Sequence, residues 1–251
     1  IPELSSIYAE PFADSSQIPT YLVSRMARQK VTVALSGDAG DEMFGGYNRH
    51  VYASSTWPTL EKIPRPLRSA AAQLMRSVKP STWDRLLGPL LANRAIAVGD
   101  KLHKAGASLK AASGDELYHG LISINPYVDT LVRQQGSTQG FEDRTLECIA
   151  ALPLPERMMA LDAVHYLPGD ILAKVDRAAM ANSLETRVPM LDVDVMRFAW
   201  SLPSEMKIRD GKGNWPLRTL LARYVPQDLF DRPKQGFGIP LDHWLRGDLR
   251  D

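Results

Sequence analysis

A short turn rich in carboxylates is the segment of this chain best suited to chemistry. Asp38, Asp41 and Glu42 fall within five residues, in the run Ser36-Gly37-Asp38-Ala39-Gly40-Asp41-Glu42-Met43-Phe44-Gly45-Gly46-Tyr47. Hard divalent cations prefer carboxylate oxygens and often bridge to substrate phosphates. The surrounding glycines let a backbone approach a ligand closely. The pattern therefore predicts a cation site that holds a polyphosphate.

Helix capping is the simpler interpretation of the same turn. Asp38 could be the N-cap of a helix with Asp41 at its N3 position, and acidic side chains in a first turn suit the helix dipole. Three carboxylates exceed what one cap needs. The spacing fits neither an EF-hand loop nor a Walker loop.

The position of the turn favours a ligand site. It follows the apolar run Val31–Leu35, which predicts a buried strand. A helix from about Pro19 to Lys30, with Tyr21, Leu22, Met26 and Ala27 as its apolar stripe, is predicted before the strand. Helix, strand and helix in this order indicate a parallel α/β layer, in which ligands bind at the carboxyl ends of strands.

The rest of the chain is predicted to be mainly helical, with no further strand. A lone strand leaves its backbone groups without partners, so its neighbours are expected from upstream sequence or from another chain. A short helix and a loop are predicted for residues 129–140. The other predicted helices cover residues 64–79, 81–92, 95–103, 114–122, 155–166, 170–183, 191–202 and 215–224.

The Gly/Pro-rich loop of residues 231–240 carries Arg232 and Lys234. Such a loop is either a solvated basic segment or a mobile lid that brings a cation to developing negative charge. Both interpretations are open on these residues alone.

Two further segments carry charges with simple structural explanations. Asp170 is predicted to cap the helix that follows it, with Lys174 as its i+4 partner, which leaves Asp176 unexplained on a largely apolar helix. Glu185 and Arg187 are expected to form a structural ion pair. Asp192 is a further predicted helix cap, and Arg177 is the second unexplained charge.

Composition excludes several classes of protein. The net charge of +1 gives no field that favours nucleic acid or an acidic membrane, and no apolar run reaches the length that spans a bilayer. Cys148 is the single cysteine, so no intrachain disulfide forms, which suits a reducing, cytoplasmic setting. The five histidines show no metal-ligand spacing.

The segments 36–47, 170–180, 184–192 and 232–240 together resemble glutamine-hydrolysing asparagine synthetases, in the same order and over nearly the whole chain. The resemblance implies an α/β fold of the adenine nucleotide alpha hydrolase-like, PP-loop ATP pyrophosphatase type. Residues 1–251 would be the C-terminal, mainly helical portion of the synthetase domain, with one or few parallel strands. The resemblance implies a cytoplasmic enzyme of amino-acid biosynthesis and is compatible with a homodimer.

The chemistry implied is amide formation. Aspartate attacks the α-phosphorus of ATP to give β-aspartyl-AMP, and ammonia from a glutaminase domain displaces AMP to give asparagine. On this sequence, Ser36 and Gly37 would contact ATP, Asp38 would also lie near the acceptor, and Asp41 would bind Mg²⁺. Lys234 would neutralise charge on the phosphates. Supporting roles fall to Glu42, Asp170, Lys174, Asp176, Arg187 and Arg232.

The chain also departs from that family. The first nucleotide motif, Ser-Gly-Gly-x-Asp-Ser, and the N-terminal cysteine of the glutaminase are absent, so the segment alone is expected to be inactive. The loop Phe12–Pro19 has no basic residue where asparagine-forming members carry an arginine. Two alternatives follow: the same adenylation on another carboxylate, such as a surface-polysaccharide, peptide or β-lactam-type precursor, or a non-catalytic helical interaction module.

Overall fold

The computed structural model describes residues 3–8, 10–87, 98–123, 147–232, 238–247 and 249–250. The chain divides into two compact units, of which the first comprises Ile1–Gly46 with Met159–Asp251 and the second Tyr47–Met158. Among the described residues, no helix is both long enough and apolar enough to cross a membrane.

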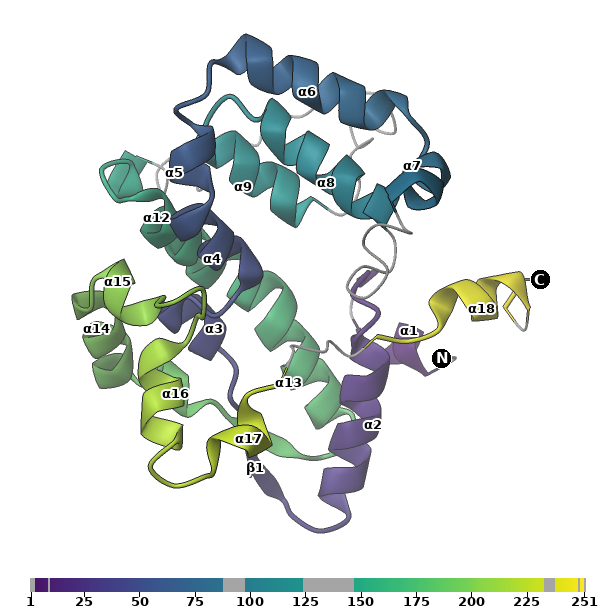
Figure 1. Cartoon of the computed structure of the whole chain (residues 1–251). Helices are drawn as coiled ribbons and strands as arrows, with labels where there is room; N and C mark the ends of the chain where they lie inside the picture. Colours follow the sequence, from purple (N-terminus) through teal and green to yellow (C-terminus); the bar gives the residue numbers. More distant parts are fainter. Residues whose placement is uncertain are drawn as a thin grey trace. The chain divides into compact units, whose positions relative to one another are not determined.

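The first unit contains the sheet and most of the predicted chemistry (Figure 1). Its elements are α1 (Leu4–Ile7), α2 (Gln17–Arg28), β1 (Val33–Leu35), α3 (Gly40–Phe44), η2 (Asp162–Leu172), α13 (Ala173–Met180), β2 (Glu185–Arg187), η3 (Pro189–Leu191), α14 (Val193–Ser201), α15 (Ser204–Lys207), α16 (Trp215–Leu221), α17 (Gln227–Phe230) and α18 (Leu241–Arg246).

The predicted strand has a partner within this chain. β1 pairs in parallel with β2, with Val33 opposite Glu185 and Leu35 opposite Arg187. The expectation of no further strand, with partners only from elsewhere, was therefore wrong. β2 is three residues long, Glu-Thr-Arg, and carries no apolar run that a sequence pattern could detect.

Each strand follows a helix, and the two helices pack together. α2 precedes β1, α13 precedes β2, and α2 and α13 lie side by side (Figure 1). A helix that returns the chain to the start of a parallel strand has its N-terminus at the carboxyl end of the sheet. The N-terminal ends of α2 and α13 therefore lie toward the edge that carries the acidic turn.

The buried face of α2 differs from the predicted one. Gln17 and Ser24 are buried, whereas Leu22 and Met26 of the expected apolar stripe are exposed. The helix packs against α13, and the hydrogen bond from Ser24 Oγ to Thr20 O satisfies the buried Ser24 hydroxyl locally. Its apolar face remains open to solvent.

The two helices predicted at 155–166 and 170–183 form one continuous helical run. α12 (Leu154–Leu161) passes into η2, a π-helical segment, and then into α13. Pro168 lies inside η2 without ending it. π-Helical segments accommodate local irregularities and occur often at functional sites. Asp170 is therefore inside a helix, and the prediction that it caps one was wrong.

The core of the first unit lies beneath the acidic turn. Met43 and Phe44 of α3 are buried with Leu167 of η2 and Ala199 of α14. Ile171 and Leu217 pack against this cluster from η2 and α16. Burial of these side chains fixes α3, and hence the carboxylates that precede and begin it.

The second unit is helical where the structure describes it. Its core contains the buried residues Trp57, Ala111 and Leu117. Ser113 caps α9 by accepting a hydrogen bond from Glu116 N. α6 and α8 lie side by side (Figure 1). The helices predicted at 64–79, 81–92, 95–103 and 114–122 overlap observed ones. The helix and loop predicted at 129–140 lie outside the described residues, as do residues 88–97 and the rest of 124–146. The elements are α4 (Asn48–Ser55), α5 (Trp57–Leu60), α6 (Arg65–Ser77), α7 (Pro80–Leu87), α8 (Val98–Lys110), α9 (Gly114–Ile122) and the start of α12.

Candidate functional site

The start of the acidic turn continues directly from the sheet. Ser36 N donates to Arg187 O at 2.8 Å, so the ladder extends one residue past β1. Ser36 Oγ donates to Asp38 Oδ2, and Asp38 N donates back to Ser36 Oγ at 3.3 Å. A Cβ at Gly37 would meet no atom within 4 Å. Ser36, Gly37 and Asp38 thus form a compact turn with open space beside its glycine.

Asp38 does not cap α3. The N-cap position belongs to Ala39, which has a left-handed backbone (φ 66°) and makes no side-chain cap bond. The capping role proposed for Asp38 was therefore wrong. Its carboxylate is oriented by the Ser36 hydroxyl instead, at the carboxyl end of β1.

Asp41 is held by a residue far along the chain. Asn214 Nδ2 donates to Asp41 Oδ1, and Asn214 N donates to Phe44 O at 3.0 Å. Gly46 N donates to Asp41 O at 2.8 Å. A Cβ at Gly46 would overlap both the Asp41 carboxylate and the Asn214 amide. Glycine is required at position 46 by internal packing rather than by a ligand.

The three carboxylates do not form one ready cluster. Asp38 is bonded to Ser36, Asp41 to Asn214, and Glu42 is buried at 1% exposure. Among the described residues, no group of three or more His, Cys, Asp or Glu side chains could hold a metal ion. Mg²⁺ needs fewer protein ligands where phosphates complete its coordination, and a ligating carboxylate is itself usually hydrogen-bonded. A role for Asp41 with a phosphate-bound ion fits this geometry.

A second set of charged groups lies at the N-terminal ends of α2 and α13. Lys174 Nζ forms an ion pair with Asp14 Oδ2, and their side chains are only 10% and 24% exposed. Asp14 also accepts from Ser16 N at 2.8 Å and from Ser16 Oγ at 2.6 Å. Tyr8 Oη donates to Lys174 O at 3.4 Å. These bonds attach the segment before α2 to the η2–α13 run.

The pKa values of the two acids in this cluster move in opposite directions. Burial raises the pKa of Asp14, but the hydrogen bonds from Lys174 and Ser16 outweigh burial and leave that pKa below its ordinary value. Burial raises the pKa of Asp170 and the Asp14 charge adds to it, against the lowering effect of Lys174. Asp170 Oδ1 is buried with no hydrogen-bond partner. Lys174 therefore stabilises mainly the charge of Asp14.

Several predicted residues lie elsewhere. Arg187 Nε donates to Glu185 Oε1 at 2.6 Å, which confirms the expected ion pair, and both side chains are exposed. Asp176 and Arg232 are exposed. Lys234 falls in residues 233–237, outside the described residues, so the lid prediction stays a prediction.

Sequence reasoning missed Asp14, Tyr8 and Asn214. The stretch Asp14-Ser15-Ser16 indicates a turn, and nothing in it points to Lys174, which is 160 residues away. Asn214 stands before a proline-containing helix start, where it reads as a cap. No local signal could have identified these three partners.

A profile of the Asparagine synthase family matches residues 1–251. A protein of Mycobacterium tuberculosis (strain ATCC 25618 / H37Rv) named "Putative asparagine synthetase [glutamine-hydrolyzing]" is 33% identical over 246 residues, covering 98% of this chain and 35% of the relative. "Asparagine synthetase [glutamine-hydrolyzing] 1" of Bacillus subtilis (strain 168) is 32% identical over 251 residues, covering 100% of this chain and 37% of the relative. The chain thus spans about a third of the length of these relatives. No solved structure matches.

Proposed function

Because the chain belongs to the asparagine synthase family, we propose that it supplies part of the active site of an ATP-dependent amide-forming ligase. In this proposal the β-carboxylate of aspartate is activated as an acyl-adenylate, with release of pyrophosphate. Ammonia from a glutaminase domain of the same enzyme then displaces AMP and gives asparagine. The observation that carries the proposal is the turn Ser36–Asp38 at the carboxyl end of β1, with open space beside Gly37.

The residues would divide the work by position. Ser36 and Gly37 would bind the nucleotide, because a hydroxyl and an unobstructed backbone at a strand end suit a phosphate or ribose. Asp38 would face the same ligand and the acceptor. Mg²⁺, when bound, supplies positive charge that stabilises the pyrophosphate leaving group, and Asp41, oriented by Asn214, would help to hold it.

Charge neutralisation would come from a loop cation. Lys234 is proposed to approach the α-phosphate and the leaving pyrophosphate, where a fixed positive charge lowers the barrier. The supporting residues would hold the helical side of the pocket in position. Lys174 and Asp170 would do so beside Asp14, and Arg187 would do so from the sheet. Glu42, Asp176 and Arg232 are assigned to this supporting set by resemblance.

The domain is proposed to have the adenine nucleotide alpha hydrolase-like fold of the PP-loop type, with its remaining strands upstream. Two features support this. Within the described residues β1 has one strand partner, β2, so one edge of β1 is open to a further strand. Leu22 and Met26 of α2 and Val33 and Leu35 of β1 expose apolar surface in the same unit. A further layer of the same domain would bury them.

A different acceptor carboxylate is the second candidate. The segment Phe12–Pro19 lacks a basic side chain, and its one charged residue, Asp14, is an acid already paired with Lys174. A segment of this kind offers no cation to a second carboxylate on the acceptor. Adenylation of a sugar acid, a peptide or a β-lactam-type precursor would meet that condition.

ATP–pyrophosphate exchange by the whole natural protein tests the proposal. Exchange should depend on Mg²⁺ and on aspartate, and a screen of other carboxylic acids separates the two candidates. Lys234→Ala should abolish exchange without changing the melting temperature, whereas Lys62→Ala, an exposed lysine of the second unit, should leave exchange unchanged. Absence of exchange with every carboxylate would favour a non-catalytic module, and full activity of Lys234→Ala would refute the role of the loop.

A further inference from the structure

Asn214 occupies a helix-cap position without acting as a cap. It is the N-cap residue of α16, and its side chain makes no hydrogen bond to the first turn of that helix. Asparagine is favoured at such positions because its side-chain oxygen accepts a backbone N–H. Here the amide is directed to α3 instead, where Asn214 Nδ2 donates to Asp41 Oδ1. Helix capping therefore does not explain the asparagine.

Two unfavourable features accompany the contact between Asn214 and Asp41. The backbone of Asn214 is left-handed, with φ 57°, a conformation that glycine adopts most readily. Asn214 Oδ1 is buried without a hydrogen-bond partner among the described residues, which costs stability because this oxygen has lost its water. A glycine would avoid both costs. What the asparagine adds over glycine is the hydrogen-bond donor to Asp41.

The backbone around Asn214 packs directly on the end of α3. Asn214 N donates to Phe44 O at 3.0 Å. A Cβ at Gly213 would lie 2.2 Å from Gly45 O and 2.8 Å from Gly46 Cα, so the two backbones are in contact there. This packing fixes the position from which the Asn214 amide reaches α3.

We propose that Asn214 is a positioning residue for the metal ion of the proposed ligase, an inference that rests on the proposed function. Its amide fixes the rotation of the Asp41 carboxylate about the Cβ–Cγ bond. The carboxylate then meets a phosphate-bound divalent cation without first reorienting. Asn214 acts through Asp41, as the hydrogen-bonding partners of metal ligands commonly do.

Asn214→Gly tests this role in the whole natural protein, because glycine keeps the left-handed backbone and removes the amide. Mn²⁺ replaces Mg²⁺, since both prefer octahedral oxygen ligands, and electron paramagnetic resonance measures its binding in the presence of α,β-methylene-ATP. The dissociation constant of Mn²⁺ should rise about 10–100-fold. The rate of ATP–pyrophosphate exchange at saturating Mg²⁺ should stay close to that of wild type.

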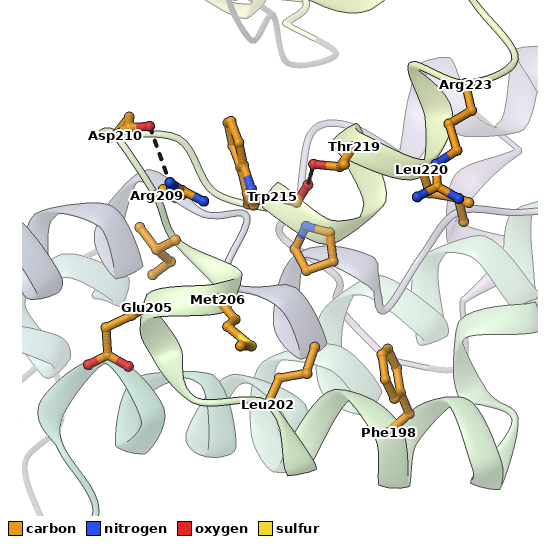
Figure 2. A pocket seen from close by; sticks show the side chains of 12 residues that line it. Phe198, Leu202, Glu205, Met206, Arg209, Asp210, Trp215, Thr219, Leu220 and Arg223 are labelled. Atoms are coloured by element: carbon orange, nitrogen blue, oxygen red, sulfur yellow. Dashed lines mark hydrogen bonds and ion pairs between the residues drawn. The ribbon is translucent and has the colours of Figure 1, made fainter.

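Asp210 provides a matched control in the same connection between α15 and α16. Its backbone is also left-handed, with φ 52°, and its Oδ2 lies 3.8 Å from Arg209 Nε (Figure 2). This side of the connection borders a groove of about 760 Å³ between α14, α15 and α16, which none of the residues proposed for ligase chemistry lines (Figure 2). Asp210→Gly removes a side chain that is not bonded to Asp41, so it should leave the dissociation constant of Mn²⁺ unchanged.

The possible outcomes separate this role from a structural one and from the proposed function. A purely structural role would reduce the number of Mn²⁺ sites per protein in Asn214→Gly and leave the dissociation constant unchanged, which would overturn the inference alone. An equal rise in Asp210→Gly would overturn it as well, because the contact with Asp41 would then not be the cause. A wild-type protein that binds no Mn²⁺ with the nucleotide would overturn the proposed function and this inference together.

Discussion

The ion pair between Asp14 and Lys174 should hold the segment before α2 against α13. Asp14→Asn keeps the size of the side chain and removes its charge, so the Lys174 ammonium loses its partner in a site where that side chain is only 10% exposed. Lys174→Met removes the ammonium and leaves Asp14 facing Asp170 without a cation. The double variant removes both charges.

The magnitude follows from the burial of the two groups. Breaking a fully buried pair by removing one partner costs about 3–5 kcal/mol, and exposed pairs contribute about 0–1 kcal/mol. With 10% and 24% of the side chains exposed, this pair lies between those limits. Each single variant should therefore lose about 2 kcal/mol, and the double variant should lose less than the sum by about 1–2 kcal/mol.

Amide hydrogen exchange in α2 and α13 is the appropriate assay, because it reports the free energy of opening of these helices separately from the second unit. The exposed pair Glu185 and Arg187 provides a matched control, and its coupling should stay below about 0.5 kcal/mol. Additive losses for Asp14→Asn and Lys174→Met, within about 0.5 kcal/mol, would show that the pair does not hold the two helices together. A coupling as large at Glu185 and Arg187 would show that burial does not set its size.

Three further outcomes are expected. The folded pKa of Asp170 is raised above its ordinary 3.8, so the contribution of Asp170 to stability is complete below that pH and is lost as the pH rises through the folded pKa. Asp170→Asn should therefore gain stability relative to wild type as the pH increases above 3.8. A difference in unfolding free energy between the two proteins that stays constant with pH would contradict this. Gly46→Ala should cost about 1–3 kcal/mol because its methyl would displace Asn214 from Asp41, whereas Gly37→Ala should be close to neutral in thermal unfolding; equal effects would contradict the packing argument. Asp192→Ala should lower the stability of α14 by about 1 kcal/mol, because it removes the hydrogen bonds that Asp192 Oδ1 accepts from Asp194 N at 2.9 Å and Val195 N at 3.3 Å. Amide hydrogen exchange in α14 measures this loss. Unchanged exchange would refute the role of Asp192 as a cap.

Local features were predictable from the sequence. The strand, the turn after it and the cap at Asp192 depend on residues that are neighbours in the chain. The ion pair of Glu185 and Arg187 joins residues two apart, so spacing alone could indicate it. The apolar run Val31–Leu35 indicates the strand, but the prediction that this strand is buried was wrong, because Val33 and Leu35 are 45% and 77% exposed.

Contacts between distant residues were not predictable. Asn214 and Asp41 are 173 residues apart, and neither residue carries a local sign of the other. β2 escaped prediction because three residues hold no periodicity, and its pairing depends on the strand beside it. α2 buries Gln17 and Ser24 and packs against α13, so tertiary packing overrode the apolar stripe.

The acidic turn divides into two parts with different demands. The space beside Gly37 is open, whereas Asp41 and Gly46 are fixed by Asn214 at the start of α16. α16 also forms one wall of the groove that Phe198, Met206 and Leu220 line. A change that displaces the first residues of α16 therefore removes the hydrogen bond by which Asn214 orients Asp41.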